Sequence, residues 1–201
     1  MSDVRRDAPS CTPVPLPSSG RAGGRPRLPR LPVLLALAVV AATAVGCGQS
    51  SKVARYNYRV ALTETMRDPA SGFVPSIEVD VVGVNDVEKP EWDALDVDAY
   101  FAPGNPRRSD GDRVLLAFSN EAPEPRVLDG KRAIWEVWEE RGATHVFFLA
   151  RMRRPGDAGS EDPRKLVLPL STEFWNPGQW IEVAVTPTGL ELRTAPATVR
   201  R

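Results

Sequence analysis

Side chains that commonly do catalytic chemistry are scarce in this sequence. Its 201 residues include one histidine, His145, and two cysteines, Cys11 and Cys47. His145 precedes the apolar run VFFLARM, and no nucleophile motif such as G-x-S-x-G lies nearby. We therefore expect His145 to be a partly exposed strand residue with a structural role. So few histidines and cysteines argue against a zinc site, and we expect neither a metal nor a cofactor.

Acidic residues cluster in two places, and neither cluster has the spacing of a known site. Those in the loop Arg154–Arg164 (RPGDAGSEDPR) have oxygens that suit calcium, but they lack the spacing of an EF-hand. The glutamates within residues 136–140 follow helical spacing, whereas glycoside hydrolysis needs two carboxylates across a cleft. We interpret both clusters as solvated surface and expect that the protein is not an enzyme.

The zero net charge of the chain hides an asymmetry. Residues 1–46 carry six arginines against two aspartates, so the remainder carries 20 basic and 24 acidic residues. Nucleic-acid binding depends on clustered lysines and arginines that neutralise phosphates. We expect no nucleic-acid partner.

Residues 1–46 have the layout of an export signal. Four arginines between positions 21 and 30 precede Leu31–Val45, which is apolar and uncharged and ends in small residues. A cleaved secretory signal without lipid and an uncleaved membrane helix are the alternatives. For a membrane helix the strongly apolar part is short, at about 15 residues where roughly 20 are needed.

The end of this apolar segment, Ala44–Cys47 (AVGC), resembles the lipobox of bacterial lipoproteins. The resemblance implies a diacylglycerol on the Cys47 thiol and cleavage between Gly46 and Cys47, although Ala44 stands where the motif prefers leucine. Residues 47–52 would then be a lipidated tether to the membrane, and two or more acyl chains give stable attachment. In such lipoproteins an aspartate after the cysteine favours the inner membrane. Gly48 therefore implies the outer membrane, with the domain facing the periplasm.

Residues 53–201 have the pattern of one β-rich domain. Apolar and polar residues alternate in short segments separated by turn signals, which favours a mainly β, antiparallel β-sandwich of the transthyretin or immunoglobulin type. The run after His145 is apolar on both faces, so we expect a central strand covered on both sides. The expected strands are residues 56–62, 77–84, 97–101, 114–118, 146–152, 165–170, 180–185 and 190–193. We expect a polar loop at residues 119–126 (SNEAPEPR), and we expect residues 186–189 (TPTG) to close a hairpin between the last two strands.

One segment, Asp129–Gly142, predicts a short amphipathic helix instead. Ile134, Val137 and Trp138 recur at helical spacing, with Asp129 and Gly142 as the expected caps. A further helical turn is expected after Pro90.

The five tryptophans have two interpretations. Pairs such as Trp135 with Trp138, or Trp175 with Trp180, would serve as stacking platforms for sugars or a partner, but tryptophans in a small β domain are more often core. Trp175 precedes the turn signal Asn176–Gly178, so we expect it to be the exposed exception.

Behind the lipobox, the order of the segments SIEVDVVGVN, DAYF and HVFFLARMRRP…KLVLPL resembles the outer-membrane lipoprotein of type VI secretion systems. The resemblance covers about residues 47–195 and rests on the order and spacing of strands. It implies a transthyretin-like β-sandwich that binds the periplasmic domain of an inner-membrane partner. The tryptophan-rich helix and the 154–164 loop are departures from the family.

These observations lead to two hypotheses. The first is a lipid-anchored, non-enzymatic scaffold that binds another envelope protein, in a secretion apparatus. Its predicted contacts are Asp157, Glu161 and Asp162 of the 154–164 loop, together with Trp175. The alternative is a lipoprotein that binds a carbohydrate or another small ligand through its tryptophans.

Overall fold

The computed structural model describes residues 53–156, 161–176 and 178–197. The predicted leader, Gly46, Cys47 and Asp157 lie outside the described residues. Within these ranges, no helix is both long and apolar enough to cross a membrane.

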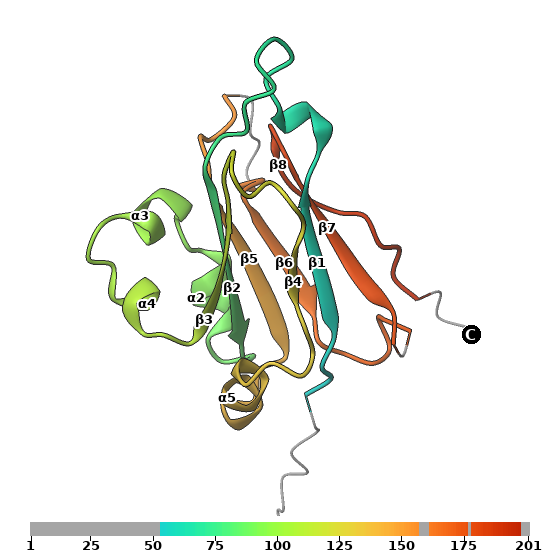
Figure 1. Ribbon diagram of the computed structural model, residues 1–201. Helices are drawn as coiled ribbons and strands as arrows, with labels where there is room; N and C mark the ends of the chain where they lie inside the picture. The colour runs from blue at the N-terminus through green and yellow to red at the C-terminus, as the bar shows by residue number, and fades with distance from the viewer. Residues whose placement is uncertain (1–52, 157–160, 177, 198–201) are drawn as a thin grey trace, which may run out of the picture. The chain divides into compact units, whose positions relative to one another are not determined.

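Two four-stranded sheets form the domain (Figure 1). The first sheet has the strand order β4-β1-β7-β8, and its strands are β1 (Asn57–Leu62), β4 (Arg126–Leu128), β7 (Trp180–Thr186) and β8 (Gly189–Leu192). The second has the order β3-β2-β5-β6, and its strands are β2 (Ile77–Val84), β3 (Arg113–Phe118), β5 (His145–Arg151) and β6 (Lys165–Pro169). The helical segments are η1 (Glu64–Met66), α2 (Lys89–Asp93), α3 (Val97–Phe101), α4 (Pro106–Ser109) and α5 (Ile134–Glu140). The predicted mainly β sandwich is confirmed.

One strand pair departs from the predicted antiparallel pattern. β1 and β7 are parallel, with Asn57 opposite Trp180 and Leu62 opposite Val185. Parallel neighbours cannot be joined by a tight hairpin and need a long connection. Here that connection is most of the domain, because β1 is the first strand and β7 is the seventh. The predicted hairpin between β7 and β8 is confirmed, with Thr186 opposite Gly189.

Aromatic side chains fill the space between the two sheets. Tyr58 of β1 and Phe148 of β5 meet edge to face at 5.3 Å, and Tyr58 stacks on Trp135 at 6.3 Å. Trp135 meets Trp138 edge to face at 5.0 Å, and none of these four side chains is exposed. Both indole N–H groups donate to backbone carbonyls, those of Asp129 and Asp112. α5 thus buries its two tryptophans in the core while Glu136 and Glu140 stay exposed, which confirms the predicted amphipathic helix.

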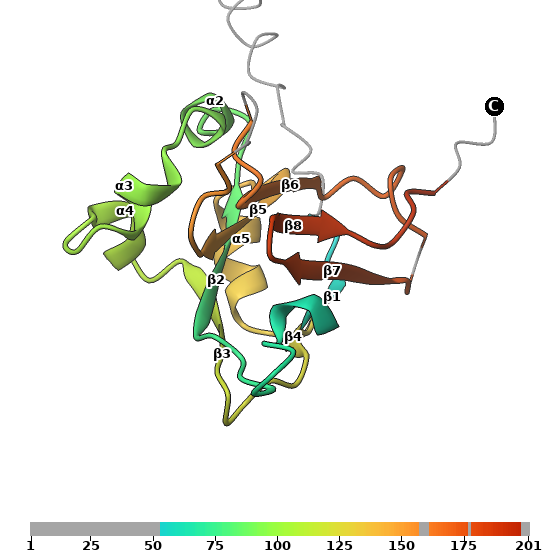
Figure 2. The same ribbon diagram turned by 90° about the horizontal axis from the view of Figure 1, so that it is seen from above.

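A second apolar cluster covers the outer face of the β3-β2-β5-β6 sheet. Val82 and Val84 of β2 and Phe147 and Leu149 of β5 point away from the first sheet and pack under residues of α2 and α3. The covering side chains are Trp92, Val97, Tyr100 and Phe101. Figure 2 shows these helices beside the second sheet, on the side away from the first. The prediction that β5 is covered on both faces is confirmed.

The strand predicted at residues 97–101 is wrong, because these residues form α3. The Asp96 side chain accepts a hydrogen bond from the Ala99 backbone N–H at 2.9 Å and caps the helix. A strand and a helix would both bury Val97 and Phe101. A strand would also bury Ala99, whereas a helix would bury Tyr100, and it is Tyr100 that is fully buried while Ala99 is exposed. The burial thus follows helical spacing rather than alternation.

Two further local predictions need correction. Asp129 does not cap α5, whose N-cap is Ala133. The Asp129 carboxylate instead accepts the Lys131 backbone N–H, in a turn before the helix. Gly142, with φ of 67°, does end the helix as predicted. The predicted 119–126 loop is shorter, because Arg126 opens β4.

The contact between β2 and α5 gives the first testable prediction. A Cβ added to Gly83 would lie 2.6 Å from Cδ2 of the Trp138 ring, and Trp138 has no room to move. We expect Gly83→Ala to lower the free energy of unfolding by about 1–3 kcal/mol in urea. Gly156→Ala is the control, because nothing lies within 4 Å of its Cβ position. Equal stability of the two variants would contradict this packing.

Candidate docking site at the loop end

The two ends of the sandwich differ (Figure 1). At the end where β1 begins, which we call the N-terminal end, α5 closes the space between the sheets, and Arg55 pairs with Glu139 at 2.5 Å. The opposite end, which we call the loop end, carries the connections that follow β1, β3, β5 and β7. Their described residues are 63–76, 119–125, 152–156, 161–164 and 187–188.

A groove of about 380 Å³ opens at the loop end. Its floor is apolar, because Met66 and Ile77 are 9% and 3% exposed, and Met152 lies beside them. Arg151 and Arg153 give it a basic rim. The full set of lining residues is Thr65, Met66, Pro75, Ser76, Ile77, Arg151, Met152, Arg153 and Pro187. An apolar floor with cationic edges suits an apolar side chain flanked by carboxylates.

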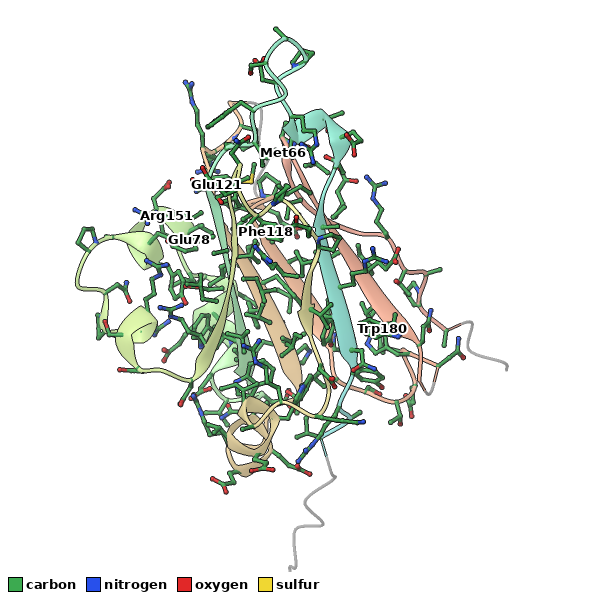
Figure 3. The ribbon with its side chains drawn as sticks, viewed as in Figure 1. Met66, Glu78, Phe118, Glu121, Arg151 and Trp180 are labelled. Atoms are coloured by element: carbon green, nitrogen blue, oxygen red, sulfur yellow. The ribbon has the colours of Figure 1, made fainter. Side chains whose placement is uncertain are left out.

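Arg151 on the rim is held by a carboxylate on the next strand. Its Nη1 lies 3.2 Å from Oε2 of Glu78, and the same oxygen accepts from Nη2 of Arg108 at 2.6 Å. Figure 3 shows Glu78 and Arg151 side by side near the loop end. Burial opposes the ionisation of Glu78, but the hydrogen bonds from the two arginines outweigh it and hold its pKa below the usual value. Glu78 therefore stays charged at neutral pH and orients the rim.

Arg108 also reaches a fully buried carboxylate, Asp80. The Asp80 side chain accepts hydrogen bonds from Arg108 Nε and Arg113 Nη1, both at 2.9 Å, and from the Tyr100 hydroxyl at 3.2 Å. A buried charge is tolerated when it is paired and hydrogen-bonded in this way. The network fastens α3 and α4 to the second sheet, so the helical segment and the groove rim share one set of ion pairs.

A second arginine fastens the β5–β6 connection to the same helical segment. The Arg164 side chain is 2% exposed and donates to both carboxylate oxygens of Asp98, at 2.6 and 3.0 Å. It also donates to both oxygens of Asp162, at 2.7 and 3.0 Å, and to the Met152 carbonyl. These hydrogen bonds lower the pKa of both Asp98 and Asp162. We call these four residues the Arg164 clamp.

The clamp changes the predicted role of the 154–164 loop. Glu161 is exposed as expected, but Asp162 is half-buried and its carboxylate is committed to Arg164. The C-terminal part of the loop thus packs against α3 instead of projecting into solvent.

The prediction that Trp175 is exposed is wrong. Its side chain is 1% exposed, its indole N–H donates to the Pro169 carbonyl at 2.8 Å, and its ring meets Tyr56 edge to face. The turn signal after it is real, but the chain turns with the ring directed inward. Trp135, Trp138 and Trp175 are all buried, which removes the predicted stacking platforms. Only Trp180, at 48%, is an exposed tryptophan.

His145 lies at the start of β5 and is partly exposed, as predicted. Its Nδ1 lies 2.9 Å from the Thr144 hydroxyl and 3.6 Å from the Asp86 carboxylate. Burial and the nearby Lys89 charge lower its pKa. Across the described part of the chain, no three His, Cys, Asp or Glu residues are grouped to hold a metal ion.

The groove itself was not predicted from the sequence. Arg151–Arg154 (RMRR) follows an apolar strand, and three arginines there are a signal of a basic edge. Met66 and Pro75 gave no such signal, since they come from another connection and meet Met152 only in the folded chain.

The fold is similar to that of solved type VI secretion components. A structure of a type VI membrane complex matches with a TM-score of 0.50 and 15% identity, over 71% of this chain and 99% of that one. The Serratia marcescens Lip, a membrane-bound component of the type VI secretion system, matches with a TM-score of 0.44 and 14% identity, over 72% and 100%. The lipoprotein TssJ1 from Pseudomonas aeruginosa gives 0.40 and 18%, over 71% and 98%. No protein-family model and no curated protein matches the sequence.

The Arg164 clamp predicts a stability that depends on pH. Both carboxyl pKa values are lowered in the folded state, so the clamp contributes above the ordinary aspartate value of 3.8 and is lost as the pH falls through the lowered values. We expect Arg164→Met to lower the free energy of unfolding by about 1–3 kcal/mol near pH 7. The difference from the native chain should shrink as the pH is lowered below 3.8.

Arg55→Met provides the control in the same urea titrations. Its ion pair with Glu139 is about a third exposed, and such a pair contributes at most about 1 kcal/mol. An Arg164→Met effect that is no larger than this, or that does not change with pH, would contradict the clamp.

Proposed function

We propose that the chain is a lipid-anchored scaffold of the bacterial cell envelope that binds another envelope protein through the groove at its loop end. The lipid on Cys47 holds the N-terminal end at the membrane, at the outer membrane and on its periplasmic side. The observation that carries the proposal is the placement of the groove at the opposite end of the sandwich from the N-terminal end. A partner that crosses the periplasm meets that end first.

The chemistry of the groove narrows the partner. Met66, Ile77 and Met152 offer an apolar floor, and Met side chains adapt to varied partner shapes. Arg153 adds an exposed positive charge beside them. We infer that the partner inserts an apolar side chain that is flanked by acidic residues.

The similarity to secretion-system structures supports a scaffold role of this kind. The matched type VI membrane complex shares the fold. The present chain also has a lipobox-like segment, Ala44–Cys47, at the end of its own leader. On this basis we infer that the chain is a component of a secretion apparatus in the cell envelope.

Filling the groove tests the proposal. Ser76 lines it, is exposed and is not needed for the core, so Ser76→Tyr should block the partner and leave the fold intact. We expect a tagged chain, purified from envelope membranes of its own bacterium, to recover an envelope protein. Ser76→Tyr should reduce that recovery at least about tenfold, which corresponds to about 1.4 kcal/mol of binding free energy.

Thr172→Tyr is the matched control, because Thr172 is exposed in the β6–β7 connection near the N-terminal end. It should recover the partner as the native chain does. Undiminished recovery with Ser76→Tyr would rule out the groove. Deletion of the 154–164 loop is a poorer test, because it would remove Asp162 and break the Arg164 clamp.

A further inference from the structure

Two large aromatic side chains are exposed near the N-terminal end. Phe174, in the connection between β6 and β7, is 46% exposed, and Trp180, the first residue of β7, is 48% exposed. Figure 3 shows Trp180 at the end of β7 that lies away from the loop end. Exposed apolar side chains that gather in one patch mark surfaces that contact a partner or a membrane.

Both residues are held close to the point where the described chain begins. Trp180 is the strand partner of Asn57, and the Tyr56 hydroxyl donates to the Ser171 carbonyl at 3.1 Å, three residues before Phe174. Val53 packs against the core just before these contacts. The two aromatics therefore lie beside the first residues of β1.

One C-terminal segment also ties the two aromatics to each other. The Thr194 hydroxyl donates to the Trp180 carbonyl at 3.2 Å, and the Ala197 backbone N–H donates to the Phe174 carbonyl at 2.7 Å. The chain from Thr194 to Ala197 spans at most about 11 Å, at 3.3–3.6 Å per residue. Phe174 and Trp180 thus lie near each other at this end of the domain, and we call these two residues the aromatic patch.

The length of the tether sets how far this patch is from the bilayer. From Cys47 to Val53 the chain reaches at most roughly 20 Å when fully extended. A lipid on Cys47 inserts into the membrane, so Val53, four residues before β1, stays within that distance of the headgroups. Tryptophan is enriched at the membrane–water interface, where its ring meets both the acyl boundary and the headgroups.

We propose that Phe174 and Trp180 rest in the interfacial layer of the bilayer to which Cys47 is tethered. This inference depends on the lipid anchor proposed above. It identifies, in addition, the face of the domain that touches lipid. Arg59 and Glu182, which follow the patch along β1 and β7, pair at 4.0 Å. The neighbouring surface therefore carries both signs of charge, and we expect contact with a zwitterionic bilayer without help from anionic lipid. The contact fixes the orientation of the domain, with the groove facing away from the membrane.

Tryptophan fluorescence tests the inference, because the other four tryptophans are at most 7% exposed. The native full chain, purified with its lipid, is reconstituted into phosphatidylcholine vesicles with or without brominated acyl chains. Brominated lipid should reduce the emission of the native chain, and most of that loss should disappear in Trp180→Phe. In the Trp180→Phe background, Phe73→Trp moves the exposed indole to the loop end, where Phe73 is 54% exposed, and should restore no quenching.

Flotation of the same vesicles separates the two proposals. A chain that floats with the vesicles but shows no quenching of Trp180 overturns the aromatic contact and leaves the anchor standing. A chain that does not float overturns both. Quenching that persists in Trp180→Phe, or that appears with Phe73→Trp, also overturns the contact.

Discussion

The packing of Tyr58, Trp135, Trp138 and Phe148 between the two sheets is the interaction on which the structure depends. No cysteine follows Cys47, so no disulfide can join the strands of the domain. Each fully buried side chain of this size contributes on the order of 1.5–3 kcal/mol through removal from water. Because α5 supplies two of the four rings, it is fixed at the N-terminal end. Position 83 of β2 requires glycine, because the Trp138 ring occupies the space that a Cβ atom would need.

The two sheets use their outer faces differently. The second sheet is covered by α2, α3 and α4, and the buried Asp80 joins that cover to β2 through Arg108 and Arg113. Arg108 also shares Glu78 with Arg151. A displacement of Arg108 is therefore expected to move Arg151 on the groove rim, because Glu78 binds both arginines. The first sheet has an exposed face that bears Trp180 and the pair of Arg59 and Glu182.

Local patterns predicted most of the fold. Short apolar segments, most of them alternating, located seven of the eight strands, and the Pro-containing turn located the β7–β8 hairpin. Alternation failed at Val97–Phe101, because the apolar residues there fit two patterns. Every second residue is apolar, as in a strand, and the third and fourth residues after Val97 are apolar too, as in a helix. The helix is selected by the packing of these side chains against the outer face of the second sheet. The parallel pairing of β1 with β7 was also beyond local patterns, since it depends on residues that are far apart in the chain.

The site was less predictable than the fold. Exposure of Trp175 was inferred from the turn that follows it, but a turn does not fix the direction in which the preceding side chain points. The carboxylate of Asp162 was assigned to a partner, whereas Arg164, two residues away, takes it. The groove combines residues of three connections, so it arises only on folding. The exposed tryptophan, Trp180, was indistinguishable by sequence from the buried ones.

The proposed lipid at Cys47 sets which end of the domain meets the membrane, and both the groove and the aromatic patch take their roles from that orientation. Mass spectrometry of the N-terminal peptide of the native protein tests for this lipid directly. We predict a chain that begins at Cys47 and carries a diacylglycerol thioether, with Gly46 and everything before it removed. An unmodified Cys47 thiol with Leu31–Val45 still attached would contradict the account.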